Sequence, residues 1–394
     1  MSPSPTLRGS WTAARDADST ATSRAPAGGA AGDFSLAEAR RIVGDHFRPN
    51  PWIYWTDFLA SWSTGMACFG LVLHPERLTS RAAWHAPLAA LLFATSALLI
   101  YRCSLFIHEL VHIRAEEFKA FRVAWNLLCG IPFLIPSFVY YTHIDHHRRK
   151  HYGTDADGEY IPLANLPPWQ ILFYLSQVFV IPIAAILRWG LLTPLTWVSP
   201  RVRDWVHRRA SSMIMDPLYV RPLPGRQVLR IIRLQEAGCL CVVWFVALRL
   251  TVSFGLFFDE PLSPWFLVQA YLTGVFIVGI NALRTLGAHR WTGSGQEMTF
   301  VEQMLDSVNY PHRPWLGGLW APVGLRFHAL HHIFPTMPYH ALAEAHRRLM
   351  RDLPADSPYR RTEARSLWSV IGQLWRHAAD GQGRREPAPH LRGS

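Results

Sequence analysis

Long apolar segments alternate with short polar ones along most of this chain. Four of these segments approach the roughly 20 residues that an α-helix needs to cross a bilayer. They are Phe58–Leu73, Pro87–Ile107, Ala237–Phe258 and Trp265–Leu283. Two more, Ala124–Tyr141 and Trp169–Val198, are interrupted by Pro or Gly, which favours re-entrant or interfacial elements. The pattern predicts an all-α membrane protein with about four transmembrane helices plus re-entrant or interfacial helices.

The two ends of the chain have a different composition. Residues 1–33 are rich in Ser, Ala, Thr, Pro and Gly and contain no apolar run, so we predict a disordered N-terminal tail without a cleavable signal peptide. Residues 379–394 are polar and rich in Gly, Pro and Arg, which predicts a flexible C-terminal tail. Residues 34–378 between them are predicted to form one catalytic membrane domain.

The distribution of charged residues predicts how the protein is oriented in the membrane. Only 17% of the residues are charged, compared with about a quarter in an average soluble protein. The net charge is +11, and lysine occurs only at Lys119 and Lys150, so arginine supplies the excess. The arginines concentrate beside the apolar runs, which is typical of cytoplasmic loops in a membrane protein. We therefore expect an integral protein of a bacterial inner membrane, and we expect no nucleic acid partner.

Three short histidine clusters carry the candidate chemistry. They are His108-Glu-Leu-Val-His112, His143-Ile-Asp-His146-His147 and His328-Ala-Leu-His331-His332. Imidazoles three or four residues apart lie on one face of a helix. Neutral imidazole is a common ligand of redox metals, and eight imidazoles exceed what one ion can hold. The clusters predict a two-metal site.

The order of clusters and apolar runs constrains the topology. If the three clusters meet, the chain must cross the bilayer an even number of times between them. Ala124–Tyr141 is then re-entrant, Trp169–Val198 is a hairpin or interfacial, and two complete spans separate the second cluster from the third. With two spans before the first cluster, the N-terminus and all clusters lie on one side. We therefore expect a cytoplasmic histidine-box cap.

The first cluster also has a second interpretation. His108-Glu109-Leu-Val-His112 matches the H-E-x-x-H motif of zinc proteases, in which Glu109 would be the general base. An intramembrane metalloprotease would need only one further ligand and would leave the other two clusters without a role. A histidine-lined metal transporter is a further, non-enzymatic alternative, although its ligands would lie near the middle of the membrane.

The three clusters resemble the histidine boxes of the membrane fatty acid desaturase superfamily, which are non-haem di-iron enzymes. The resemblance covers most of residues 57–349 and includes the order of spans and clusters. It implies a ninth ligand, His289, at the end of the last span. The ligand set that it implies is His108, His112, His143, His146, His147, His289, His328, His331 and His332.

The resemblance also implies the reaction. Two Fe ions with O2 as co-substrate would abstract hydrogen from a fatty acyl chain. We predict a fatty acid desaturase of lipid metabolism. Three alternatives on the same scaffold remain: an alkyl hydroxylase, an acyl hydroxylase, and a fatty acid decarboxylase that makes terminal alkenes. The decarboxylase belongs to a bacterial branch of the superfamily that this chain also resembles.

Other residues are expected to support the site. Carboxylates commonly orient metal-bound imidazoles, and the candidates are Glu109, Asp145, Asp157, Glu159 and Asp306. The candidates for binding a substrate carboxylate are Arg284, Arg290 and Arg326. The sequence contains no G-x-G-x-x-G dinucleotide fingerprint after a strand. We therefore expect electrons from an external ferredoxin, rubredoxin or cytochrome-type donor with its NAD(P)H reductase.

Overall fold

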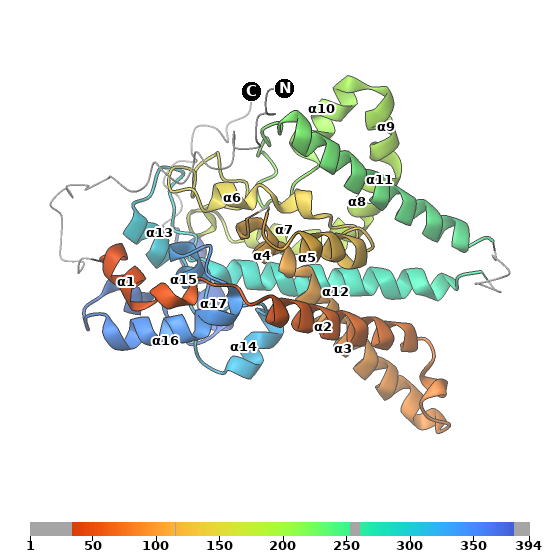
Figure 1. The fold of residues 1–394 in the computed structure, drawn as a ribbon, viewed down its shortest axis with the longest axis horizontal. Helices are drawn as coiled ribbons and strands as arrows, with labels where there is room; N and C mark the ends of the chain where they lie inside the picture. The colour runs from red at the N-terminus through yellow and green to blue at the C-terminus, as the bar shows by residue number, and fades with distance from the viewer. Residues whose placement is uncertain (1–33, 115, 253–260, 382–394) are drawn as a thin grey trace, which may run out of the picture. The chain divides into compact units, whose positions relative to one another are not determined.

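The computed structural model describes residues 34–381 except residues 115 and 253–260 (Figure 1). These residues are mainly helical and contain no β-strand, only isolated bridges. The helices before residue 200 are α1 (Leu36–Ile42), α2 (Pro51–Leu71), α3 (His85–Ser104), α4 (Phe106–His112), α5 (Lys119–Trp125), α6 (His143–His146), α7 (Trp169–Ser176), α8 (Ile181–Leu187) and α9 (Thr193–Val198). The later helices are α10 (Pro200–Arg209), α11 (Arg226–Arg249), α12 (Pro264–Ala288), α13 (Phe300–Asp306), α14 (Pro314–Trp320), α15 (His328–Ile333), α16 (Leu342–Asp352) and α17 (Leu367–Ala379).

Four helical segments among the described residues are long and apolar enough to cross a membrane. They are Ala82–His112, Ile181–Val198, Arg226–Arg249 and Pro264–Ala288. Three of them overlap predicted spans. The remaining predicted span forms α2, which has 21 residues but includes Asp57 and several Ser, Thr and Trp residues, and it is not among the four. The fourth segment, Ile181–Val198, lies instead where we predicted a hairpin or interfacial element.

The number of membrane crossings restricts whether Ile181–Val198 can be a complete transmembrane span. His146 precedes this segment and His289 follows α11 and α12, yet their Nε2 atoms are 3.2 Å apart. Three complete crossings between them would place the two imidazoles on opposite sides of the bilayer. If α11 and α12 both cross, Ile181–Val198 does not cross completely. Its helix is also interrupted by a π-helical turn at Arg188–Leu192, which packs with α9 against α11.

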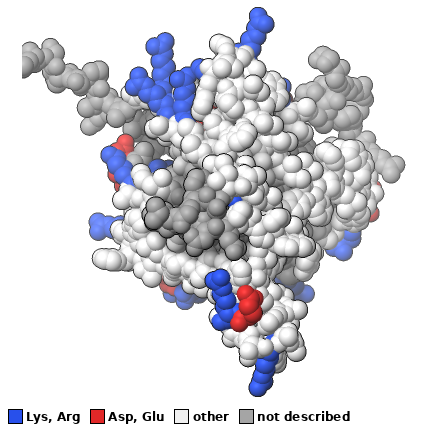
Figure 2. Space-filling view, turned by 90° about the vertical axis from the view of Figure 1, so that its right-hand side faces the viewer, with Lys and Arg blue, Asp and Glu red and all other residues white. Residues whose placement is uncertain are grey.

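The long helices expose apolar surface to their surroundings. In Figure 1, α2, α3, α11 and α12 extend to the right, away from α4, α6 and α15. Only 22% of the apolar window of α11 and 17% of that of α12 are buried inside the protein. Seen from the right-hand end, the described surface carries few charged side chains, and these lie mainly toward its rim (Figure 2). Apolar surface of this extent indicates a membrane protein.

Local sequence signals place the ends of the helices that lead to the histidines. Ser263 caps α12 by accepting a hydrogen bond from the Trp265 N–H, and Pro264 occupies the first turn, where its missing N–H costs nothing. The helix ends at Ala288, and the backbone of the next residue, His289, is extended. Before the first histidine cluster, Leu105 alone separates the long helix α3 from α4. His108 and His289 therefore both follow directly from the ends of long apolar helices.

The segment between the first and second clusters folds back instead of crossing. It consists of α5, a π-helical turn at Asn126–Gly130 and a short 3-10 helix at Ser137–Tyr140. Trp125 is fully buried, and its indole N–H donates a hydrogen bond to the Cys103 carbonyl at 2.8 Å. The segment thus packs against α3 and α4 and returns the chain to the side where the first cluster lies.

Candidate metal centre

Nine imidazoles from four parts of the chain converge in two groups. Within each group, one nitrogen from every residue lies within 4.8 Å of the others. We call the first group cage A; it contains His108, His112, His143, His147 and His331. We call the second group cage B; it contains His146, His289, His328 and His332. The structure therefore brings together all nine of the ligands that the family resemblance implied.

The spacing within each cluster determines how its imidazoles are shared. In the second cluster, the i, i+4 pair His143 and His147 enters cage A, whereas His146 enters cage B. The third cluster does the reverse, because its i, i+4 pair enters cage B and His331 enters cage A. Each His-x-x-His-His cluster thus contributes to both cages. The shorter first cluster contributes only to cage A.

The separations between nitrogen atoms test whether the cages fit metal ions. In cage A the Nε2 atoms of His143 and His147 are 3.0 Å apart, and those of His112 and His331 are 3.2 Å apart. In cage B the Nε2 atoms of His289 and His328 are 2.9 Å apart. Imidazole nitrogens about 2.1 Å from one ion and at right angles would lie about 3.0 Å apart. The donor set therefore fits one first-row metal ion in each cage.

Burial keeps most of these imidazoles in the form that binds metal. Desolvation, reinforced by neighbouring imidazoles, lowers the pKa of five of them: His143, His147, His328, His331 and His332. They are therefore neutral at neutral pH, as metal ligation requires. His146 differs. Burial acts to lower its pKa, but the charge and hydrogen bond of Asp157 outweigh burial and raise it.

Two carboxylates after the second cluster hold imidazoles through Nδ1. The Nδ1 atom of His143 is 2.9 Å from Glu159 Oε2, and that of His146 is 2.8 Å from Asp157 Oδ2. Asp157 is itself fixed because the Gly153 N–H donates to it at 3.1 Å. A carboxylate on Nδ1 leaves Nε2 free for a metal and fixes the orientation of the ring.

A third carboxylate, Asp306 at the end of α13, supports His289. Its Oδ2 is 3.5 Å from His289 Nδ1 and accepts a hydrogen bond from the Tyr152 hydroxyl at 2.7 Å. The Tyr152 oxygen is also 2.8 Å from His289 Nδ1. Burial acts to raise the pKa of Asp306, but its hydrogen bonds with His289, Thr292 and Tyr152 lower it, so the carboxylate is charged. The sequence therefore identified Asp306 as a supporting residue but not Tyr152.

Glu109 and Asp145 do not have the role that the sequence suggested. Glu109 Oε2 accepts hydrogen bonds from the Tyr54 hydroxyl at 2.5 Å and from the Tyr339 N–H at 3.1 Å, so it ties α4 to α2 and to the chain after α15. Asp145 pairs with Arg148 at 2.7 Å and lies 3.4 Å from His151 Nδ1. Among the described residues, neither carboxylate contacts an imidazole of either cage. Asp157 and Glu159 take that role because a tight loop returns them to α6.

The three arginines suggested for substrate binding lie in different environments. Arg290 donates to the carbonyls of Leu305 and Arg361, and Arg326 donates to those of Tyr310 and Pro311. These two guanidiniums thus hold loops together. Arg284 is buried on α12, with 7% of its surface exposed, five residues before His289.

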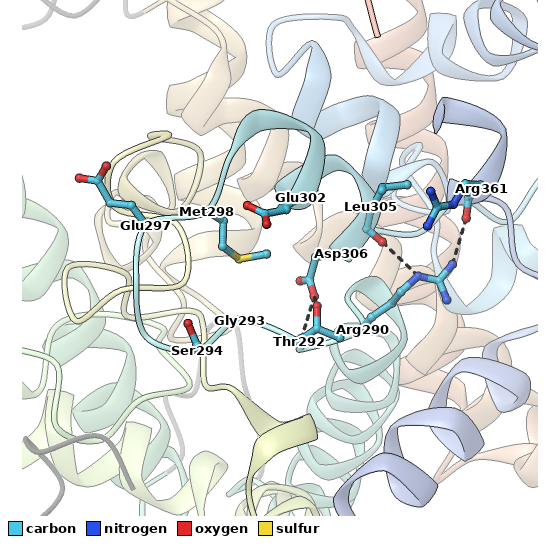
Figure 3. A pocket seen from close by; sticks show the side chains of 10 residues that line it. All are labelled: Arg290, Thr292, Gly293, Ser294, Glu297, Met298, Glu302, Leu305, Asp306 and Arg361. Carbon is cyan, nitrogen blue, oxygen red and sulfur yellow. Dashed lines mark hydrogen bonds between the residues drawn. The ribbon is translucent and has the colours of Figure 1, made fainter. Parts of the chain in front are cut away.

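A polar pocket of about 600 Å³ opens on the far side of Asp306 (Figure 3). Its lining includes Arg290, Arg361, Glu302 and Thr292, whose hydroxyl donates to Asp306 Oδ1 at 2.8 Å. Asp306 thus contacts the pocket with one oxygen and supports cage B with the other. Asp306 alone therefore separates the pocket from His289, a candidate metal ligand.

Comparison with known proteins agrees with the architecture of the site. A family model described as fatty acid desaturase matches residues 82–363, which include all nine imidazoles. The chain is also 37% identical to a ceramide hydroxylase from Caulobacter vibrioides (strain NA1000 / CB15N) over 366 residues. That alignment covers 91% of this chain and 99% of the relative. No solved structure matches significantly. The family model covers well over half of the chain and confirms the resemblance, so this protein belongs to the fatty acid desaturase family.

Proposed function

We propose that this oxidoreductase of the desaturase family is a di-iron hydroxylase that acts on a ceramide-type lipid. The observation that carries the proposal is the 37% identity to a ceramide hydroxylase over nearly the full length of both proteins. The histidine clusters and their family resemblance favoured a desaturase, with a hydroxylase as an alternative. Both reactions begin with removal of hydrogen from an alkyl carbon. A hydroxylase then adds oxygen to that carbon, whereas a desaturase removes a second hydrogen from its neighbour.

The cages supply a place for two iron ions. Cage A would hold one through five imidazoles and cage B the other through four. Two ferrous ions bound there supply dioxygen activation and the oxidising power to attack an unactivated carbon. In the overall reaction, a C–H group and O2 give an alcohol and one water molecule, with two electrons and two protons consumed.

The protein's own residues prepare the site for this chemistry. Buried neutral imidazoles hold the ions without adding negative charge. Asp157, Glu159 and Asp306 keep three of the rings in fixed orientations. Low exposure of His108, His143 and His331, at 1–2%, excludes bulk water from the oxidant.

Electrons would come from a ferredoxin, rubredoxin or cytochrome-type donor with its NAD(P)H reductase, at the cytoplasmic side of a bacterial inner membrane. We propose that the donor docks over the pocket next to Asp306. One observation supports this position: a hydrogen-bonded connection leads from the pocket through Asp306 and Tyr152 to His289.

Lipid analysis of cells that express the chain tests the reaction. Cells supplied with defined ceramides under ¹⁸O2 should accumulate a ceramide with one additional oxygen atom that carries the label. Expression of His331→Ala, which lacks a ligand of cage A, is the matched control and should give no product. A ceramide that loses two hydrogens would show a desaturase. A terminal alkene formed from a fatty acid would show a decarboxylase, and either result would overturn the proposal.

A further inference from the structure

Helix α10 carries basic and aromatic side chains on its exposed face. Ser199 caps the helix by accepting a hydrogen bond from the Val202 N–H. Arg201, Trp205 and Arg208 follow at positions i, i+4 and i+7, so they share one face of the helix, and all three are exposed. More than half of Trp205, 56%, is exposed. A face that combines arginine with tryptophan is typical of a helix that lies in the interface between membrane and water.

The first two turns of α11 repeat this arrangement. Arg226, Arg230 and Arg233 have the same spacing as the three residues of α10, and all are exposed. Leu234, one turn after Arg230, is 74% exposed. The basic face therefore continues directly into the apolar surface of a helix that is long and apolar enough to cross a membrane.

The two exposed faces lie in one region of the protein. Arg188 joins them, because its Nη2 donates to Ser211 Oγ, just after α10, at 3.1 Å and to Glu236 Oε1 on α11 at 2.5 Å. In Figure 1, α10 lies beside the start of α11, and in Figure 2 Lys and Arg side chains gather toward the same, upper side. We call this region the α10–α11 surface; its exposed residues include Arg201, Trp205, Arg208, Arg226, Arg230 and Arg233.

The arginines of this surface have no acidic partner in contact. Residues 199–233 contain eight arginines, no lysine and two aspartates. Within the part of the chain that the structure describes, no carboxylate oxygen lies within 4.0 Å of these guanidiniums. The exposed helix α16 differs, because Arg347 pairs there with Glu344 and Arg351 with Asp352. The α10–α11 surface therefore presents positive charge to an external anion.

The neighbouring segments indicate what kind of anion this is. The apolar segment Ile181–Val198 ends directly before the cap of α10, and α11 is itself a candidate span. The surface thus lies between two apolar segments, at the level where phospholipid head groups begin. The exposed Trp197 and Trp205 agree with this position, because tryptophan is enriched at that level. A soluble acidic protein would match the charge but not the continuation into the apolar surface of α11.

We infer that the α10–α11 surface binds the head groups of anionic phospholipids. Arginines close to an anionic membrane surface are attracted to it, and a guanidinium can bind two phosphate oxygens at once. A zwitterionic phospholipid carries the same phosphate, but its own cation opposes the arginines. The surface should therefore select lipids that carry a net negative charge. This inference does not depend on the reaction at the metal centre.

Lipid selectivity of the purified full-length protein tests the inference. The protein in an uncharged detergent is titrated with phosphatidylglycerol or phosphatidylcholine, and bound lipids are counted by native mass spectrometry. We expect the wild type to prefer phosphatidylglycerol. The variant Arg230→Gln/Arg233→Gln should reduce that preference about tenfold or more, because each arginine near an anionic surface contributes about fivefold. The matched control, Arg347→Gln/Arg351→Gln, removes the same charge from α16 and should keep the preference.

Iron content separates a binding defect from misfolding. The segment after α10 is attached to the loop that carries Asp157 and Glu159, because the N–H groups of Met215 and Asp216 donate to the Gly158 carbonyl at 2.8 and 3.0 Å. Misfolding of this region would therefore disturb the carboxylates that orient the imidazoles. We expect Arg230→Gln/Arg233→Gln to keep the wild-type iron content, and Arg230→Lys/Arg233→Lys, which retains the charge, to keep most of the lipid preference.

Fluorescence quenching tests the position of the surface in a bilayer. Lipids brominated near the head group should quench the emission that disappears in Trp205→Phe more strongly than lipids brominated near the chain end. Emission from Trp205 that neither lipid quenches would overturn the inference. Equal losses of lipid preference in the two double glutamine variants, or a loss seen only together with loss of iron, would also overturn it. If lipid preference survives Arg230→Gln/Arg233→Gln but KM for an acidic ferredoxin rises, the surface binds a protein and the lipid inference is wrong.

Discussion

Cage A and cage B use imidazoles from the same two His-x-x-His-His clusters but are completed in different ways. Cage A gains two further ligands from α4, which makes five. Cage B gains only His289, which follows the end of α12 and reaches four. The three clusters therefore supply every ligand of cage A, whereas cage B depends on a residue outside every cluster.

Hydrogen bonding to the rings also differs between the cages. In cage B, His146 is held by Asp157, and His289 by Tyr152 and Asp306. In cage A, only His143 contacts a carboxylate, and both nitrogens of His108 are buried without a hydrogen-bond partner among the described residues. Cage B has fewer ligands that are better oriented, and cage A has more ligands with less support. The two cages thus differ both in the number of ligands and in the hydrogen bonds that support them.

The largest effect should come from the cage with no spare ligand. We expect His289→Ala to leave three imidazoles in cage B, to reduce bound iron to one ion per chain or less, and to lower product formation more than about 100-fold, beyond the effect of losing a supporting group. Metal analysis of the purified protein and mass spectrometry of the lipids would measure both. Two irons with unimpaired turnover would show that His289 is not a ligand.

Removal of a ligand from cage A should be less damaging. His112→Ala leaves four imidazoles there, the number that cage B has in the intact protein. We expect this variant to retain more iron than His289→Ala when both are titrated with ferrous ion under anaerobic conditions. Equal or greater loss in His112→Ala would show that the fifth imidazole is essential and that the comparison by ligand number is wrong.

The supporting carboxylates should show the same order, with a larger effect in cage B than in cage A. Asp306→Asn removes the charged partner of the His289–Tyr152 pair, and we expect iron affinity to fall about 10- to 100-fold. Glu159→Gln affects one ligand of five, so its effect should be several-fold smaller. A larger effect for Glu159→Gln in the same titration would contradict this order.

The smallest effect concerns stability without metal. Burial raises the pKa of Glu159 to about 8, even though the nearby His146 acts to lower it. Between about pH 4.5 and 8, the folded metal-free protein keeps a proton that the unfolded chain releases, so stability falls as pH rises through this window. Glu159→Gln should flatten the dependence of Tm on pH over that range. The exposed Glu116→Gln is the control, and an unchanged slope in Glu159→Gln would contradict the assignment.

The histidine clusters were predictable because their information is local. Spacings of three and four residues fix which imidazoles share a helix face, whatever the rest of the chain does. His289 has no such spacing and was found only through the family resemblance. The division into cages A and B depends on how α4, α6 and α15 pack together, which no single segment specifies.

Local environment explains why some residues differ from what their sequence position predicts. Glu109 lies between two ligands in sequence, but on the helix it points toward Tyr54 and Tyr339. Glu159, which the sequence did suggest, lies twelve residues beyond the second cluster and reaches His143 because the intervening loop is tight. The apolar run at Phe58–Leu73 does form a helix, α2. Near the start of α2, Asp57 forms an ion pair with Arg102 of α3. This helix is therefore stabilised partly by a polar contact with its neighbour and not only by its own apolar side chains.

The sharing of each His-x-x-His-His cluster between both cages has a consequence for assembly. Binding of the first ion in cage A immobilises α6 and α15, and with them His146, His328 and His332 of cage B. Three of the four donors for the second ion are then already in place, so binding of the second ion does not carry the entropy cost of ordering them. Occupancy should therefore be cooperative, and a chain carrying a single ion should be rare at any iron concentration.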